Sequence, residues 1–363
     1  MSEHTNLQVA LSSSAPDNED VLGPLAEVSQ RNNLDALSMR LMEMRDWLAD
    51  ELSSLEAHIG EVVHDPAPDI AWKAAQYLLE QPGKRVRPVC VLLAARMGGV
   101  GFTDAVRQVA IACELVHNAT LLHDDVIDQG TDRRGAPTSR MIYGNAASVL
   151  GGDHLLIEAL RRVNGLGIGL HTSLLEVIAS MVSAEVLQLE LRRRFRPERD
   201  LYLQVVEGKT AALFRWALEA GGTVGGLTDQ EIDNLGRIGT ALGMTFQLVD
   251  DLLDIEGDPT QTGKALFTDL AEGKLTWPLI LGSERSPEVA LKLRSVAGSE
   301  EELTGDEAVE LVQMVRDTQA IEDTRLEASR YANQAQQLIR TLPNGRARTA
   351  LETVVETALH RCR

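Results

Sequence analysis

The stretch TDAVRQVAIACELVHNATLLHDDVID, residues 103–128, predicts one long helix. It contains neither glycine nor proline, its apolar residues recur at helical spacing, and Thr103 can cap its start. Aromatic residues make up only 4% of the chain, and its alanines and leucines favour helix over strand. We therefore expect an all-α protein.

Helical patterns continue on both sides of this stretch. A capping box formed by Thr228 and Glu231 starts one of them. The helices expected from spacing and caps lie at about 34–59, 69–81, 145–163, 173–194, 200–220 and 228–255. No internal repeat of fixed length is present. We expect one helical domain over residues 35–363, preceded by a disordered N-terminal tail over the polar, aperiodic residues 1–34.

Composition excludes several classes of function. The formal net charge of −19 repels nucleic acid and anionic membrane surfaces. The longest apolar run, VCVLLAA at 89–95, is far shorter than a membrane span. Three cysteines without C-x-x-C spacing predict neither a disulfide framework nor a zinc cluster. We expect a soluble cytoplasmic protein without stable membrane insertion.

Two D-D-x-x-D clusters end long apolar helical runs. The first is Asp124, Asp125 and Asp128, and the second is Asp250, Asp251 and Asp254. On a helix the first and last aspartates of a cluster lie about 40° apart, and we expect all three carboxylates to converge on one cation site. Such carboxylates repel by roughly 3 kcal/mol per pair unless cations neutralise them. Oxygen-only donors favour Mg²⁺ or Mn²⁺, bound together with a diphosphate.

Basic residues follow at the breaks between helices. They are Lys84, Arg85, Arg87, Arg133, Arg134, Lys209, Lys264 and Lys274. Arginine suits bidentate phosphate contact and lysine acts as a point charge, so two anionic substrates would account for the duplication. Each residue alone is also compatible with a solvated surface charge, and we interpret the run RRRF at 192–195 in that way.

Seven stretches carry a resemblance to a known family. They are GKRVRP (83–88), ELVHNATLLHDDVIDQGTDRRGAPT (114–138), GGDHLL (151–156), LQLE (187–190), GKTAALF (208–214), FQLVDDLLDIEGD (246–258) and DLAEGKLTWPLI (269–280). In this order they resemble the trans-isoprenyl diphosphate synthases, or polyprenyl synthetases, and in particular their medium- and long-chain members. The resemblance implies the isoprenoid synthase fold, with long helices around a deep central cavity, and a homodimer.

The resemblance also implies roles for individual residues. Asp124, Asp125, Asp128, Asp250, Asp251 and Asp254 would hold Mg²⁺, and all but Asp254 would be catalytic together with Lys209. The metal ions would bind the diphosphate of an allylic substrate. This allylic diphosphate would also contact Arg133, Lys209, Thr210, Gln247 and Lys264. Isopentenyl diphosphate would be bound by Lys84, Arg87, His117 and Arg134. The implied reaction is metal-assisted ionisation of the allylic diphosphate, followed by attack of isopentenyl diphosphate. A charge count favours three Mg²⁺ per site, with Mn²⁺ as the alternative.

Product length is expected to depend on the helical turn before the first cluster. Ala119 and Thr120 should face the same cavity as Asp124, and both are small. In the resembling family bulky residues here stop elongation early, so we predict a product of C20 or longer. One local departure is Phe267, which stands where the family commonly has glycine.

Two other functions share parts of this pattern. A terpene cyclase also ionises a diphosphate at an aspartate cluster, but it has no need of Lys84, Arg87 and Arg134. A non-catalytic subunit of a heteromeric synthase usually has one degraded metal site, whereas both clusters are complete here.

Overall fold

The computed structural model describes residues 34–62, 69–133, 135–192, 194–256, 267–297 and 305–361. The stretch that begins at Thr103 forms helix α6 (Asp104–Ile127), and the Thr103 side chain accepts a hydrogen bond from the backbone N–H of Val106. The predicted capping box starts α12 (Asp229–Glu256), where the Thr228 N–H donates to Glu231 at 2.8 Å. These two helices end in the two aspartate clusters.

Helices account for nearly all regular structure in the described ranges, so the predicted all-α class is confirmed. Before α6 lie α2 (Asp35–Trp47), α3 (Ala49–Glu61), α4 (Ile70–Leu79) and α5 (Val86–Met97). Between α6 and α12 lie a short antiparallel ribbon of β1 (Asp132–Arg133) and β2 (Ala136–Pro137), then α7 (Ser139–Tyr143), α8 (Asn145–Asn164), α9 (Ile168–Leu191), α10 (Arg199–Val206), the π-helical turn η2 (Glu207–Ala211) and α11 (Ala212–Val224). After α12 come α14 (Thr268–Ala271), α15 (Trp277–Arg285), α16 (Pro287–Ala297), α17 (Gly305–Asp317), α18 (Ala320–Ile339) and α19 (Arg346–His360).

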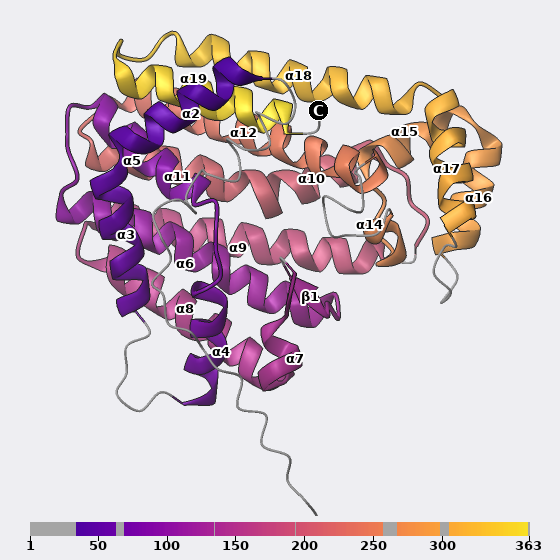
Figure 1. Cartoon of the computed structure of the whole chain (residues 1–363), viewed down its shortest axis with the longest axis horizontal. Coiled ribbons are helices and arrows are strands. Elements are labelled where there is room, and N and C mark those ends of the chain that lie inside the picture. The colour runs from indigo at the N-terminus through magenta and orange to yellow at the C-terminus, as the bar shows by residue number, and fades with distance from the viewer. Residues whose placement is uncertain are drawn as a thin grey trace, which may run out of the picture.

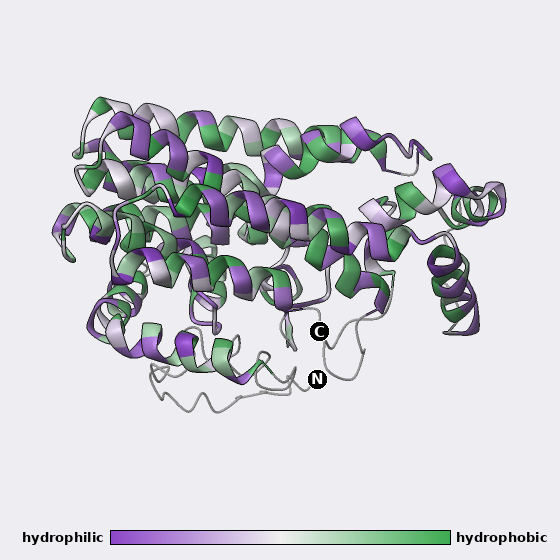
Figure 2. Ribbon diagram, turned by 90° about the horizontal axis from the view of Figure 1, so that it is seen from above, coloured by the Kyte–Doolittle hydropathy of each residue, from purple (hydrophilic) through white to green (hydrophobic). Residues whose placement is uncertain are grey.

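Helices α6, α11 and α12 form the centre of the bundle. Helix α6 packs on α5, α8 and α11, while α12 packs on α11 and α18. In Figure 1, α18 and α19 cover one side, α4, α7 and α8 cover the opposite side, and α14 to α17 gather at one end. Figure 2 shows hydrophobic and hydrophilic residues alternating along the helices, as expected for amphipathic helices that share a core. The two cluster-bearing helices are therefore held inside the bundle.

A close helix crossing brings η2 against α12. A Cβ added at Gly239 would lie 2.6 Å from Cα of Arg215, and one added at Gly243 would lie 2.4 Å from Cα of Ala211. Only glycine permits this approach. The sequence predicted one uninterrupted helix over 200–220. The structure instead has a π-helical turn at 207–211, where the chain packs against α12.

Three further predictions concern a membrane span, the N-terminal tail and the cysteines. None of their helices is long and apolar enough to cross a membrane. Of the predicted N-terminal tail only Leu34 is described, so that prediction and the domain boundaries stay predictions. Cys90 and Cys113 are buried free thiols, while Cys362 lies outside the described residues.

Candidate active site

Two adjoining cavities lie between the cluster-bearing helices. The larger cavity, of about 550 Å³, is walled by α6, α8, α9, η2 and α12, and Asp124 and Asp250 both line it. The second, which we call the polar cavity, has a volume of about 260 Å³ and contains Asp128 and Asp251 in its lining. The two cavities share the residues Leu121, Asp124, Lys209, Thr210 and Gln247. The aspartate clusters thus face each other across a common space.

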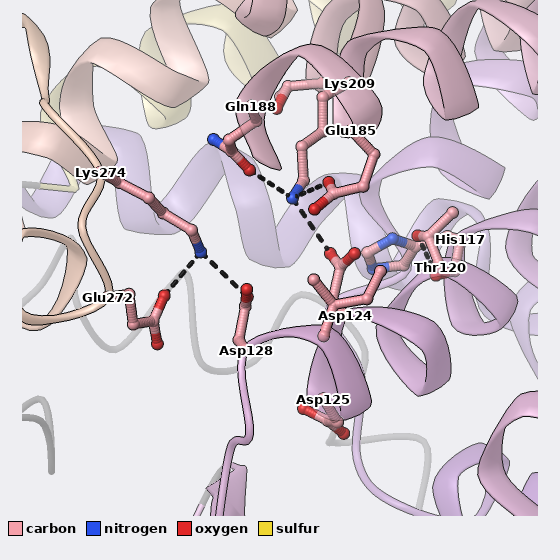
Figure 3. A network of polar contacts seen from close by, with 12 residues as sticks. His117, Thr120, Asp124, Asp125, Asp128, Glu185, Gln188, Lys209, Glu272 and Lys274 are labelled. Atoms are coloured by element: carbon pink, nitrogen blue, oxygen red, sulfur yellow. Dashed lines mark hydrogen bonds and ion pairs between the residues drawn. The ribbon is translucent and has the colours of Figure 1, made fainter. Parts of the chain in front are cut away.

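In the first cluster two carboxylates, not three, face this space. Asp124 lines both cavities and Asp128 lines the polar cavity, whereas Asp125 lines neither. Asp125 is buried and accepts two hydrogen bonds from Arg133, at 2.7 and 3.0 Å. Burial raises the pKa of Asp125, and the Arg133 hydrogen bonds oppose that rise. The predicted convergence of three carboxylates is wrong here, because successive helical residues are turned by about 100°; Figure 3 shows Asp125 away from the two lysines.

The second cluster is divided in a similar way. Asp250 lines the larger cavity and pairs with Arg361 at 2.8 Å. Asp251 lines the polar cavity and is buried, and burial raises its pKa to about 7. Asp254 lines neither cavity; its carboxylate accepts a hydrogen bond from the Asp269 N–H, and burial raises its pKa to about 8. Asp250 and Asp251 are therefore the members of this cluster that face the cavities.

Three hydrogen bonds hold the Asp251 carboxylate. The Tyr202 hydroxyl donates at 2.7 Å, the Trp277 backbone N–H at 2.8 Å and the Gln247 side-chain amide at 3.0 Å. The oxygen of the same Gln247 amide accepts from the Thr210 hydroxyl at 3.0 Å. Gln247 and Thr210, both predicted from the resemblance, thus belong to one network that joins η2 to α12.

Basic side chains neutralise the aspartates that face the cavities. Lys209, at η2, lies 3.6 Å from Asp124, while Lys274 lies 2.9 Å from Asp128. Figure 3 shows both ammonium groups between these aspartates and other polar side chains. Arg192 also pairs with Asp128, and its side chain is only 15% exposed. The interpretation of Arg192 as a solvated surface charge is therefore wrong, because this residue directly follows α9 and contacts the C-terminal end of α6.

The residues assigned to isopentenyl diphosphate are only partly brought together. Arg87 and His117 line the larger cavity. The Arg87 guanidinium lies 4.3 Å from the centre of the Phe214 ring, and burial lowers its pKa. Lys84 is exposed and lines neither cavity. Arg134 and Lys264 lie outside the described residues, so their assignments stay predictions.

The two proposed chain-length residues have different environments. Thr120 lines the larger cavity, and its hydroxyl donates to the His117 carbonyl at 2.7 Å. Ala119 does not line the cavity, because its side chain is fully buried in the helical core. Thr120 is four residues before Asp124 and shares its face, whereas Ala119 is five residues away and is turned by about 140°. The prediction that Ala119 faces the cavity is therefore wrong.

Six residues that contact the aspartates or their lysines were missed from the sequence: Glu185, Gln188, Arg192, Tyr202, Glu272 and Arg361. Gln188 and Glu185 contact Lys209, and Glu272 contacts Lys274 at 2.6 Å. Gln188 lies within LQLE and Glu272 within DLAEGKLTWPLI, two stretches that the resemblance included without a role for either residue, and Arg192 was interpreted as part of a surface run. They approach the aspartates from distant positions in the chain.

The donor atoms fit a hard divalent cation. The cavity-facing members of both clusters offer carboxylate oxygens alone, which suits Mg²⁺ or Mn²⁺ better than zinc. Among the described residues no group of three His, Cys, Asp or Glu side chains is already arranged to hold a metal ion.

Comparison with known proteins identifies the family. The family model for polyprenyl synthetase matches residues 68–315. Octaprenyl diphosphate synthase of Escherichia coli is 34% identical over 332 residues, 90% of this chain and 100% of that protein. Heptaprenyl diphosphate synthase component 2 of Geobacillus stearothermophilus is 33% identical over 315 residues, 86% of this chain and 96% of that protein. The crystal structure of a decaprenyl diphosphate synthase from Rhodobacter capsulatus superposes with a TM-score of 0.82 at 32% identity, covering 88% of this chain and 99% of that one. The chain belongs to the polyprenyl synthetase family.

Proposed function

We propose that this enzyme condenses an allylic diphosphate with isopentenyl diphosphate, head to tail and in the trans configuration, to form a polyprenyl diphosphate of C20 or longer. Chain elongation by prenyl transfer is the activity of its relatives. The observation that carries the proposal is that Asp124 and Asp250, from opposite helices, line one cavity together with Lys209. A diphosphate needs such a charged space, and a growing prenyl chain needs the apolar one beside it.

The family uses allylic and isopentenyl diphosphates and a divalent metal ion. Asp124 and Asp128 on one wall and Asp250 on the other would hold the metal, and we propose three Mg²⁺ per site, with Mn²⁺ as the alternative. When bound, these ions withdraw charge from the departing diphosphate. Asp251 supports the second wall through its contacts with Tyr202 and Gln247.

The chain's own cations complete the binding of both substrates. Lys209 and Lys274 face the polar cavity and can donate to the allylic diphosphate. Arg133 lines the same cavity while Asp125 holds its guanidinium. Arg87, which lines the larger cavity together with Asp124, would bind isopentenyl diphosphate. Aliphatic walls exclude water from the allylic carbocation, and no side-chain nucleophile is needed.

The length of the product follows from the shape of the larger cavity. Beyond Asp124 its lining is mainly aliphatic, and it includes Val116, Leu156, Ile178 and Met181. Thr120 is the small residue that faces this space one turn below the aspartate. No bulky side chain at that position stops a growing chain, which supports a product of C20 or longer.

We also propose that the enzyme is a cytoplasmic homodimer. The face formed by α8 and α9 carries large exposed apolar side chains. Val149, Val182, Val186 and Leu189 are exposed there and also line the larger cavity. A second copy packed on this face would shield both the surface and the cavity from water. Analytical ultracentrifugation of the purified protein tests this, and a monomer at micromolar concentration would contradict it.

One assay separates the candidate functions. The purified protein is incubated with Mg²⁺, farnesyl diphosphate and labelled isopentenyl diphosphate, and the dephosphorylated products are separated by chromatography. Linear prenols of C20 or longer support the synthase. Cyclised hydrocarbon supports a terpene cyclase. If no product forms until a second protein is added, the chain is a subunit of a heteromeric enzyme. Asp124→Ala should lower turnover by orders of magnitude, whereas Glu176→Gln, on an exposed face of α9, should not.

A further inference from the structure

The same three-part arrangement occurs twice in the network of Figure 3. An aspartate of the first cluster shares a lysine with a glutamate that belongs to neither cluster. Lys209 contacts Asp124 and Glu185, and Lys274 contacts Asp128 and Glu272. The glutamates come from α9 and from the turn after α14, far from α6 in sequence. Cluster chemistry alone does not explain why each lysine has a second carboxylate.

Glu185 occupies an unfavourable place for a charge. Its side chain is 14% exposed and lines the larger cavity beside Met181, Val182 and Val186. A carboxylate in such a wall is costly unless a cation is paired with it. Within the described ranges, Lys209 is the cation that pairs with it.

The Lys209 ammonium has three N–H donors and three acceptors around it. These acceptors are Glu185, Gln188 at 2.9 Å and Asp124 at 3.6 Å, which is the longest of the three contacts. If Asp124 turns to a metal ion, one donor becomes available to a diphosphate oxygen while Glu185 and Gln188 still hold the lysine. Lys274 has a similar environment, because its ammonium lies 2.6 Å from Glu272 and 2.9 Å from Asp128.

We propose that Glu185 and Glu272 are positioning residues that keep Lys209 and Lys274 in place and thereby release Asp124 and Asp128 to bind the metal–diphosphate complex. The inference rests on the proposed function. Without Glu185, the positive charge of Lys209 would have Asp124 as its one carboxylate partner. The lysine would then compete with the metal ion for that aspartate.

The test measures binding, so it does not depend on turnover. Inorganic pyrophosphate is titrated into the full-length protein by calorimetry at a series of Mg²⁺ concentrations. Glu185→Gln keeps the shape of the side chain but removes its charge, and it should raise the Mg²⁺ concentration needed for half-maximal binding by about tenfold. Glu185→Asp, which keeps the charge, should recover part of the loss. Glu176→Gln, exposed on the same helix, should bind as the wild type does.

A double-mutant cycle separates positioning from a general structural role. In a Lys209→Met background, Glu185→Gln should cause no further loss, because no lysine is left to hold. Glu272→Gln should behave likewise with and without Lys274→Met. Wild-type Mg²⁺ dependence in Glu185→Gln, or an equal loss in both backgrounds, overturns the inference. Melting temperatures show whether a variant is misfolded. If Glu185→Gln is misfolded, the Mg²⁺ dependence of pyrophosphate binding by Glu185→Asp supplies the decisive measurement.

The outcomes also separate this inference from the proposed function. Failure of the proposed function appears as a wild-type protein that neither binds Mg²⁺ with pyrophosphate nor elongates farnesyl diphosphate. Failure of the inference alone leaves the wild type active and the glutamate variants unchanged in their Mg²⁺ dependence.

Discussion

Asp251 makes the stability of the metal-free protein depend on pH. Its carboxyl group is 1% exposed, and burial raises its pKa from 3.8 to about 7 even though Trp277, Tyr202 and Gln247 donate hydrogen bonds to it. The folded protein therefore keeps a proton between pH 4 and pH 7 that the unfolded chain has lost. Because the unfolded state binds fewer protons in this range, the free energy of unfolding falls as the pH rises from about 4 to about 7.

The structure sets the size of this effect and the perturbation that removes it. A rise in pKa from 3.8 to about 7 corresponds to at most about 4 kcal/mol. Asp251→Asn cannot ionise, and its amide oxygen can still accept from Trp277 and Tyr202. A flipped Gln247 amide can accept from the new N–H₂ group and donate to the Thr210 hydroxyl. We expect the variant to gain stability relative to the wild type as the pH rises.

The measurement is urea denaturation of both proteins at pH 5, 6, 7 and 8 in the presence of a chelator. Asp233→Asn, an exposed position on the same helix, is the matched control. Asp254, whose pKa burial also raises, leaves part of the pH dependence in every variant. A stability difference between Asp251→Asn and the wild type that stays constant from pH 5 to pH 8 would refute the reasoning.

Four further substitutions test the packing around the cavities. Gly243→Ala places a Cβ 2.4 Å from Cα of Ala211, so it should lower the free energy of unfolding by about 1–3 kcal/mol and weaken pyrophosphate binding by displacing η2; denaturation and calorimetry measure both effects. Phe267→Gly relieves a left-handed φ of 58° but removes a fully buried ring, so a net loss of about 2–4 kcal/mol is expected in denaturation, and a gain would contradict the packing argument. Thr120→Phe should shorten the products separated by chromatography, whereas Ala119→Phe should chiefly lower the melting temperature; unchanged products from Thr120→Phe would reject it as a floor.

Local sequence signals placed the starts of α6 and α12, whereas the single helix expected over 34–59 is divided at Leu48 into α2 and α3. Thr103 and the Thr228–Glu231 pair cap helices that start within a residue of their predicted positions, because capping depends on neighbouring atoms only. The π-helical turn at 207–211 was missed. The stretch EGKTA has no proline and lies within a helical pattern, so its own residues do not signal the turn, which packs against Gly243 of α12.

The candidate site shows the same division between local and distant information. Helical geometry correctly placed Asp124 and Asp128 on one face, and the same 100° rule separates Asp125 from them. The partners of these aspartates could not be predicted from spacing. Arg192 lies 64 residues from Asp128, and its apparent membership of a surface run concealed its contact. Such pairings depend on how helices cross.

These pairings change the electrostatic argument for the site. Two aspartate clusters on apolar helices predict strong repulsion, which only bound metal ions would relieve. In the structure the relief is internal, because lysine or arginine pairs with Asp124, Asp128 and Asp250, and burial favours a proton on Asp251. A metal ion alone must displace these cations from the aspartates, which removes one acceptor from Lys209 and one from Lys274. A metal ion that arrives with diphosphate gives the displaced lysines new oxygen acceptors, so binding of the two should be mutually dependent.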